Sequence, residues 1–195
     1  MKKKSAVIGV LVSFLSIAQP LVIGTGAALT STAAILAIPE KAKAENAEFY
    51  LFRGVDKVES GDYAGAMSDF DQAIDINPSL RLAYFNRGTL KSRYLKDYAG
   101  AISDFDKAIQ FGYKRAYMNR GLSKKQLNDF EGAIVDYTLA ITNDSKHISA
   151  YFNRGNAFYL TGNYDAAISD FLETLRIDRN HIRKTSAYRM IGLSN

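Results

Sequence analysis

Arginine and aspartate recur together in this chain, and they are its best candidates for chemistry. In each of four blocks an arginine stands directly before a glycine, and an aspartate stands further on, directly before an aromatic residue. The pairs are Arg53 with Asp69, Arg87 with Asp104, Arg120 with Asp136, and Arg154 with Asp170. The arginines could bind an acidic ligand, or each could form a salt bridge that links two segments of the fold. Because the two residues always occur together, we favour the salt bridge, within one block or between neighbouring blocks.

Other residues that could support catalysis or metal binding are few. Neither His147 nor His181 is followed three or four residues later by a second histidine or a carboxylate, as a metal site on a helix requires. We expect both to be solvated loop residues. The chain has no cysteine, which excludes disulfides, iron–sulfur clusters and thiolate zinc sites. We therefore expect no catalytic residue, no metal, no cofactor and no enzymatic activity.

The elements that hold the arginine and aspartate pairs follow from a period close to 34 residues. Blocks of the form aromatic-x-x-Arg-Gly open at Tyr50, Tyr84, Tyr117 and Tyr151, at spacings of 34, 33 and 34 residues. Small residues such as Gly88 and Ala101 stand where two helices must approach closely, and aromatic residues supply the apolar bulk around them. A fixed period of this length indicates stacked helical repeats.

These blocks resemble the tetratricopeptide repeat, a helix-turn-helix unit with aromatic, glycine and alanine residues at such spacings. The resemblance implies an all-α fold, an α-solenoid of four repeats. The repeats cover about residues 47–80, 81–113, 114–147 and 148–181. Residues 182–193 resemble one more first helix without its partner and are predicted to form a capping helix.

Local signals mark the turns and one irregularity. The predicted N-caps of the four second helices are Asp62, Asp97, Asp129 and Asn163. Gly61 and Gly162 precede two of these caps, and Gly112 suits a left-handed helix end. The second unit carries one extra residue, with 13 steps from Gly88 to Ala101 against 12 in the other units. This insertion and a short link to the third unit predict irregular stacking between the two.

The first 44 residues are predicted to be a secretory signal peptide or a membrane anchor. Three lysines at positions 2–4 precede residues 5–39, which contain no charged side chain, and Ala-Lys-Ala at 42–44 has the form of a cleavage site. An uncleaved anchor stays open because about 20 apolar residues can span a bilayer. In both cases the lysines predict that residues 45–195 lie outside the cytoplasm.

The net charge of +5 comes mostly from this leader. Its five lysines and one glutamate leave about +1 for the remaining residues. A nearly neutral domain is not expected to bind nucleic acid backbones. We therefore expect a protein or peptide partner, no nucleic acid, and membrane contact only through an uncleaved leader.

The resemblance implies that the first helices line a concave groove that holds an extended or helical peptide. A stripe offset by one residue from the inward face supplies the candidate groove residues. They are Phe85, Thr89, Arg93, Arg115, Met118, Leu122, Lys125, Phe152, Asn156 and Tyr159. Phe85, Met118 and Phe152 occupy equivalent places on successive first helices and are predicted anchors, with Arg115 and Lys125 as nearby cations.

Two functions remain open from the sequence. The first is a non-enzymatic, monomeric adaptor or assembly factor that binds a partner peptide in this groove. The second is a structural subunit that uses the same solenoid for permanent assembly or self-association. A receptor for chaperone tails is not expected, because Leu51 and Val55 stand where the carboxylate clamp of such proteins needs lysine and asparagine.

Overall fold

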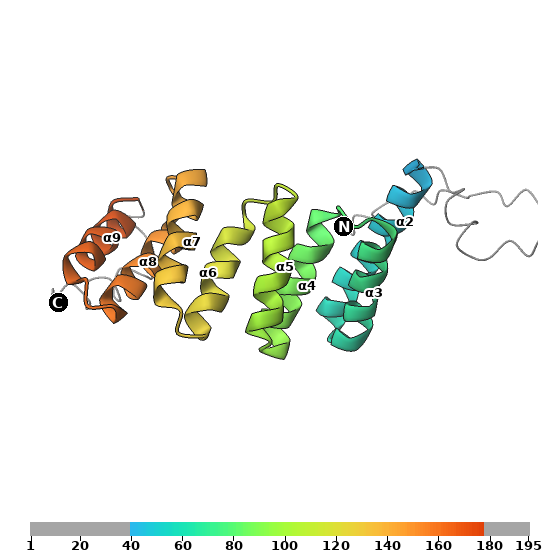
Figure 1. Ribbon diagram of the computed structural model, residues 1–195, viewed down its shortest axis with the longest axis horizontal. Helices are drawn as coiled ribbons and strands as arrows, with labels where there is room; N and C mark the ends of the chain where they lie inside the picture. The colour runs from blue at the N-terminus through green and yellow to red at the C-terminus, as the bar shows by residue number, and fades with distance from the viewer. Residues whose placement is uncertain (1–39, 178–195) are drawn as a thin grey trace, which may run out of the picture. The chain divides into compact units, whose positions relative to one another are not determined.

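The computed structural model describes residues 40–177, which form eight α-helices, one short π-helical segment and no β-strand. The helices are α2 (Glu40–Ser60), α3 (Tyr63–Ile76), α4 (Arg81–Leu90), α5 (Tyr98–Gln110), α6 (Ala116–Gln126), α7 (Phe130–Asn143), α8 (Ile148–Leu160) and α9 (Tyr164–Ile177). They form the pairs α2 with α3, α4 with α5, α6 with α7, and α8 with α9, and each helix contacts the next along the chain (Figure 1). The expected all-α repeat fold is confirmed.

The two ends of the chain carry predictions that lie largely outside this part. The predicted capping helix (182–193) and most of the predicted leader (1–44) fall outside the described residues. The first described helix, α2, starts at Glu40 and includes the Ala-Lys-Ala motif at 42–44. No helix within residues 40–177 is long and apolar enough to cross a membrane.

Each second helix starts at its predicted cap. The Asp62 carboxylate accepts a hydrogen bond from the backbone N–H of Gly65 at 2.9 Å. The equivalent bonds run from Gly100 to Asp97 at 2.9 Å, from Gly132 to Asp129 at 2.9 Å, and from Ala166 to Asn163 at 3.3 Å. These caps satisfy backbone donors that have no partner within the helix. The four predicted N-caps are therefore confirmed.

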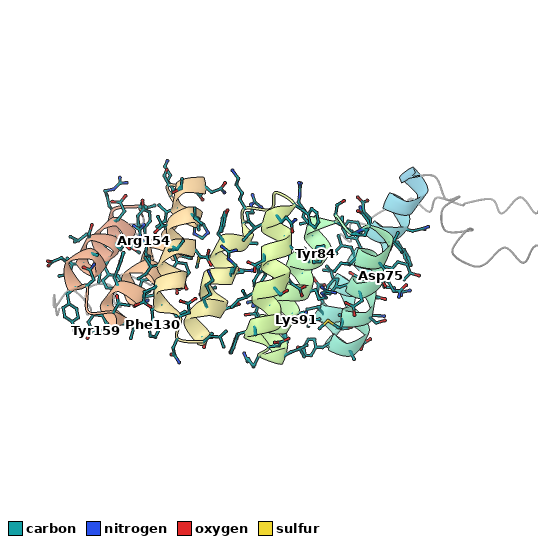
Figure 2. All side chains as sticks on the ribbon, in the orientation of Figure 1. Asp75, Tyr84, Lys91, Phe130, Arg154 and Tyr159 are labelled. Carbon is teal, nitrogen blue, oxygen red and sulfur yellow. The ribbon has the colours of Figure 1, made fainter. Side chains whose placement is uncertain are left out.

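Within each pair, a glycine of the first helix lies against a buried ring of the second. A Cβ atom added at Gly88 would lie 2.9 Å from Cε1 of Phe105 and 3.2 Å from the carbonyl oxygen of Ala101, which leaves no room for a side chain. The equivalent contacts are Gly54 with Phe70, Gly121 with Tyr137, and Gly155 with Phe171. The predicted close approach of the paired helices is confirmed, and side chains fill the spaces between them (Figure 2).

The extra residue of the second unit is accommodated at the end of its first helix. There α4 continues into the π-helical segment Lys91–Leu95, which ends at Lys96 in the left-handed conformation with φ of 59°. A π turn closes over one more residue than an α turn, so the insertion widens the helix locally. The corresponding turns of the first and fourth units use Gly61 and Gly162, with φ of 84° and 80°.

The hydrophobic core continues from one unit into the next. One buried cluster combines Phe70 of the first unit with Ala83 and Leu90 of the second. Another combines Tyr137 of the third unit with Ala150 of the fourth. Each unit is therefore stabilised by its neighbours, as in other solenoids.

Candidate functional site

Each arginine of the repeated pairs binds the aspartate of its own unit. Arg53 on α2 donates from Nε and Nη2 to the two carboxylate oxygens of Asp69 on α3, at 2.8 and 2.5 Å. The pairs Arg87–Asp104, Arg120–Asp136 and Arg154–Asp170 repeat this two-point geometry at 2.5–3.0 Å. All four aspartates are buried. The bridges therefore hold the first and second helices of each unit in one relative position.

A further contact of the same arginines joins consecutive units. Arg87 donates from Nη1 to Asp71 of the preceding unit at 2.5 Å. The equivalent contacts are Arg120 to Asp106 at 2.6 Å and Arg154 to the hydroxyl of Thr138 at 3.0 Å. We call the four arginine and aspartate pairs the ladder. The prediction that they form structural salt bridges is confirmed, and the same arginines also contact neighbouring units.

A lysine one turn after the arginine brings a second positive charge to three of the buried carboxylates. The pairs are Lys57–Asp69 at 2.9 Å, Lys91–Asp104 at 2.8 Å and Lys124–Asp136 at 3.0 Å. The hydrogen bonds from Arg53 lower the pKa of Asp69 below its ordinary value, and those to Asp136 raise the pKa of Arg120. Each of the four guanidinium groups is therefore engaged by the buried carboxylate of its own unit.

Two neighbouring hollows open along the first helices. One, of about 310 Å³, is lined by residues that include Thr89, Ser92, Arg93, Asn119 and Leu122. The other, of about 210 Å³, is lined by residues that include Val55, Val58, Glu59, Thr89, Arg93 and Tyr94. Both contain Thr89 and Arg93, so the two hollows adjoin, and together we call them the α4 groove. Three predicted groove residues, Thr89, Arg93 and Leu122, line it.

Arg93 is an exposed cation of the α4 groove whose charge is not paired. Its guanidinium makes no hydrogen bond or ion pair within residues 46–177, whereas each of the four paired arginines is held by a carboxylate. Val58 and Leu122 give the groove apolar walls on either side of this charge, and Glu59 adds one carboxylate. The groove therefore combines apolar surface with one cation that is available to a ligand.

Two of the three predicted anchors, Phe85 and Phe152, are partly buried against other aromatic rings, and the third, Met118, is buried. The ring of Phe85 packs on Tyr113, with centroids 4.8 Å apart, and that of Phe152 lies 5.9 Å from Phe171. Met118 is buried in the cluster that joins the third and fourth units. Helical periodicity placed these side chains on the groove stripe, but that stripe borders the core, where large apolar groups contact the second helix. Phe85 and Phe152 line none of the three hollows described, and their role as peptide anchors stays a prediction.

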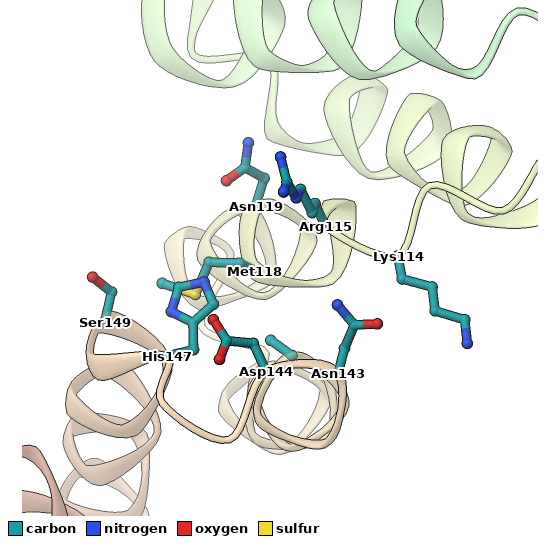
Figure 3. A pocket seen from close by; sticks show the side chains of 9 residues that line it. Lys114, Arg115, Met118, Asn119, Asn143, Asp144, His147 and Ser149 are labelled. Carbon is teal, nitrogen blue, oxygen red and sulfur yellow. The ribbon is translucent and has the colours of Figure 1, made fainter. Parts of the chain in front are cut away.

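A third hollow, of about 680 Å³, lies where the third and fourth units meet (Figure 3). Its lining includes Arg115 and Met118 of the α6 region, Asp144 after α7, and His147 before α8. Figure 3 shows His147 beside Met118, and Lys114 pointing away from the other labelled side chains. His147 lies in the loop before α8, as predicted, and is partly buried in this wall. Within the described residues, no group of histidines and carboxylates is placed to hold a metal.

The remaining predicted groove residues are not among those that line these hollows. Lys125 on α6 donates from Nζ to the side-chain oxygen of Asn153 on α8 at 3.5 Å. Tyr159 is exposed, and its ring lies edge-on to Tyr164 at 5.5 Å between centroids. Asn156 is partly buried on α8. These three residues belong to the later part of the first-helix stripe, away from the α4 groove.

The sequence reasoning did not assign Asn119 or Tyr94 to a site. Asn119 lines both the α4 groove and the third hollow, and its amide donates to the hydroxyl of Thr89 at 3.5 Å. The repeat period could have indicated Asn119, because asparagine recurs at the equivalent positions Asn86 and Asn153. Tyr94 lines the groove as part of the π-helical segment. The 13-step spacing indicated one extra residue in this unit but not where it lies.

The comparisons with known proteins agree with this architecture. Residues 114–147 and residues 148–181 each match a family model described as the tetratricopeptide repeat. The third and fourth units are therefore similar to the tetratricopeptide repeat. A search of curated proteins gave no match.

Solved structures of the same fold include several repeat proteins. A crystal structure of MamA shares 22% identity with this chain at a TM-score of 0.69, covering 76% of this chain and 84% of MamA. A tetratricopeptide repeat protein from Parabacteroides merdae shares 22% identity at a TM-score of 0.67, over 76% of this chain and 61% of that one. For pilF of Pseudomonas aeruginosa the values are 20% identity and 0.65, over 77% and 68%. At these identities the likeness concerns the fold alone.

Proposed function

We propose that this chain is a non-enzymatic scaffold that binds a segment of a partner protein in the α4 groove. The observation that carries the proposal is the pairing state of the arginines. Carboxylates of the solenoid occupy the four ladder arginines, whereas Arg93 stands unpaired in a hollow with apolar walls. An unpaired guanidinium beside apolar surface suits a peptide that carries both an acidic group and apolar side chains.

The walls of the α4 groove define the chemistry of the bound segment. Val55, Val58 and Leu122 offer contacts for apolar side chains, and Arg93 offers two parallel donors to one carboxylate. Glu59 lies in the same hollow as Arg93, so a basic residue of the peptide belongs at that end. The two opposite charges then give the bound segment a direction along the groove.

The place of action is part of the same proposal. The lysines at positions 2–4 and the uncharged residues 5–39 support an exported or membrane-tethered protein. The scaffold would then act outside the cytoplasm as an adaptor or assembly factor, and it would stay monomeric in the absence of its partner. Light scattering at increasing protein concentration tests the last point, because a self-associating subunit would gain molar mass.

Peptide selection with a matched pair of variants tests the binding site. Peptides are selected from a random library on the wild-type protein, and their Kd values are then measured by calorimetry. Arg93→Glu should weaken binding about tenfold or more, which corresponds to about 1.4 kcal/mol. Arg81→Glu makes the same charge change on an exposed residue at the start of α4 that does not line these hollows, and it should leave Kd unchanged.

Two outcomes would contradict the proposal. If the selected peptides contain no acidic residue, Arg93 does not bind a carboxylate of the partner. If both variants lose affinity equally, the effect comes from the net charge of the protein and not from the position of Arg93. Circular dichroism on the same samples confirms that both variants are folded.

A further inference from the structure

The first helix of the first unit, α2, has two exposed phenylalanines on one side. Phe49 and Phe52 are 58% and 63% exposed and lie three residues apart, so they share one side of the helix. The equivalent residues of the later units are small or polar, namely Ala83, Ala116 and Ala150, and Asn86, Asn119 and Asn153. The three alanines are fully buried. The first unit therefore has exposed apolar surface where the later units are closely packed, and such surface is typical of protein interfaces.

Arg53, next to these phenylalanines in the sequence, has a donor that no described residue accepts. Its Nε and Nη2 bind Asp69, as the equivalent arginines bind theirs. In units two to four, Nη1 of the arginine donates to Asp71, Asp106 or Thr138 of the preceding unit. No described helix precedes α2 (Figure 1), and Nη1 of Arg53 has no acceptor within residues 46–177. The Arg53 side chain is accordingly 45% exposed, against 17–18% for the other three arginines.

Aromatic rings hold this guanidinium beside the exposed apolar surface. Cζ of Arg53 lies 5.3 Å from the ring centroid of Phe49 and 4.9 Å from that of Tyr50. Cation–π contacts at these distances favour one position of the charge. The free donor of Arg53 is therefore held in place before a ligand binds.

Asp56 adds a negative charge to the same side of α2. It is exposed and lies one turn beyond Phe52. The equivalent residues of the later units are buried, namely Leu90, Ser123 and Ala157. We call Phe49, Phe52, Arg53 and Asp56 the α2 end face. Aromatic residues and arginine are enriched in the energetically important parts of protein interfaces.

A second copy of the chain does not match the α2 end face. If two solenoids stacked end to end, α9 of one copy would lie against α2 of the other. The residue of α9 that is equivalent to Asp71 is Leu172, which cannot accept a hydrogen bond from Arg53. Such stacking would bury the free donor without a partner, which is unfavourable. The chemistry therefore favours a different protein.

We propose that the α2 end face binds a helix of a partner protein, because a second helix packs on the equivalent side of each later first helix. The partner helix offers a carboxylate to Nη1 of Arg53 and a basic residue to Asp56. Small residues beside that carboxylate make room for the rings of Phe49 and Phe52. None of the four residues of the α2 end face lines the α4 groove, so this is a separate surface.

Selection of helical peptides on a variant that lacks the cation of the α4 groove tests this surface. Full-length protein with Arg93→Glu, in mild detergent, is used to select from a library of single helices with random residues on one side. Calorimetry then measures Kd for the selected peptides, which should contain an acidic residue. Adding Phe52→Ser should raise Kd about tenfold or more. Val135→Ser, the matched control at a 57% exposed residue of α7, should leave Kd unchanged.

A double-mutant cycle tests the contact with Arg53. Arg53→Lys keeps a cation beside Asp69 but removes the additional donor, and the acidic residue of the peptide is separately changed to its amide. Each change alone should raise Kd about fivefold or more, and the two together should raise it little further. Circular dichroism confirms that the Arg53→Lys variant is folded, and the change in the peptide needs no such control.

The other outcomes overturn the proposal. Selected peptides without an acidic residue, or additive losses in the cycle, would mean that Arg53 does not bind the partner helix. Equal losses for Phe52→Ser and Val135→Ser would mean that binding is not located at the α2 end face. Failure to select any peptide would mean that this face is not open to a partner in the full-length chain. Self-association in light scattering that Phe52→Ser abolishes would mean that a second copy covers it.

Discussion

Replacing Tyr137 with phenylalanine should stabilise the protein. Tyr137 is fully buried on α7, and its hydroxyl has no hydrogen-bond partner within the described part of the chain. The equivalent rings of the other units, Phe70, Phe105 and Phe171, carry no hydroxyl. The substitution therefore removes a buried polar group and keeps the packed ring.

The magnitude follows from the cost of an unpaired buried group. Leaving a hydroxyl without a partner costs about 1–3 kcal/mol, so the variant should gain about 1–2 kcal/mol and about 2–6 °C in Tm. Burial, and then the nearby Asp136 carboxylate, raise the pKa of Tyr137 above its ordinary value of 10.0. Above pH 10 the unfolded chain releases this proton and the folded protein does not, so the wild type loses stability as pH rises further. The advantage of the variant should therefore grow above pH 10.

Thermal unfolding followed by circular dichroism, from pH 7 to pH 11, measures both effects. The matched control is Phe105→Tyr, which adds a hydroxyl at the equivalent buried place of the second unit and should lower Tm. An unchanged or lower Tm for Tyr137→Phe at pH 7 would refute the reasoning, because the hydroxyl would then have a partner. If the difference in Tm between the variant and the wild type stays constant above pH 10, the assigned direction of the pKa shift of Tyr137 is refuted.

Three further substitutions test the packing and the ladder. Ala101→Leu should cost about 1–3 kcal/mol by overpacking the contact with Gly88, and an unchanged Tm would contradict that contact. Phe85→Ala should lower the free energy of unfolding by about 1–3 kcal/mol in urea titrations, because its ring packs on Tyr113. Reduced peptide binding in a fully stable variant would instead support Phe85 as a peptide anchor. Arg87→Ala should cost about 3 kcal/mol, since it leaves the buried Asp104 with only Lys91; a stable variant that fails to bind would make the ladder the ligand site.

The repeat architecture could be predicted from the sequence because its signals are local and recur. The N-caps could be predicted because each requires only a residue such as Asp62 at the start of a helix. The close contact of the paired helices could be predicted because it requires only a glycine such as Gly88 opposite an aromatic ring. The ladder was predictable as a salt bridge because two opposite charges recur together. The contact from Arg87 to Asp71 of the preceding unit was left open, since it depends on how neighbouring units stack.

The site was less predictable for the same reason. Periodicity identifies the face of a helix but not which side chains of that face meet a neighbouring segment. Phe85 and Phe152 lie on the predicted stripe, and each ring also lies against an aromatic ring of another segment. The π-helical segment changes the end of α4, and with it the positions of Arg93 and Tyr94 in the groove. His147 joins a hollow that forms only where two units meet.

Photocrosslinking from the α4 groove tests the central claim most directly. Benzoylphenylalanine is placed at Leu122, in the groove, or at Val135, an exposed apolar residue of α7, in the full-length chain within a total extract of its native cells. Irradiation should give one adduct of defined mass from position 122 and none from position 135. Adding Arg93→Glu should reduce that adduct. An adduct from position 135 without one from position 122 would contradict the assignment of the α4 groove as the partner site.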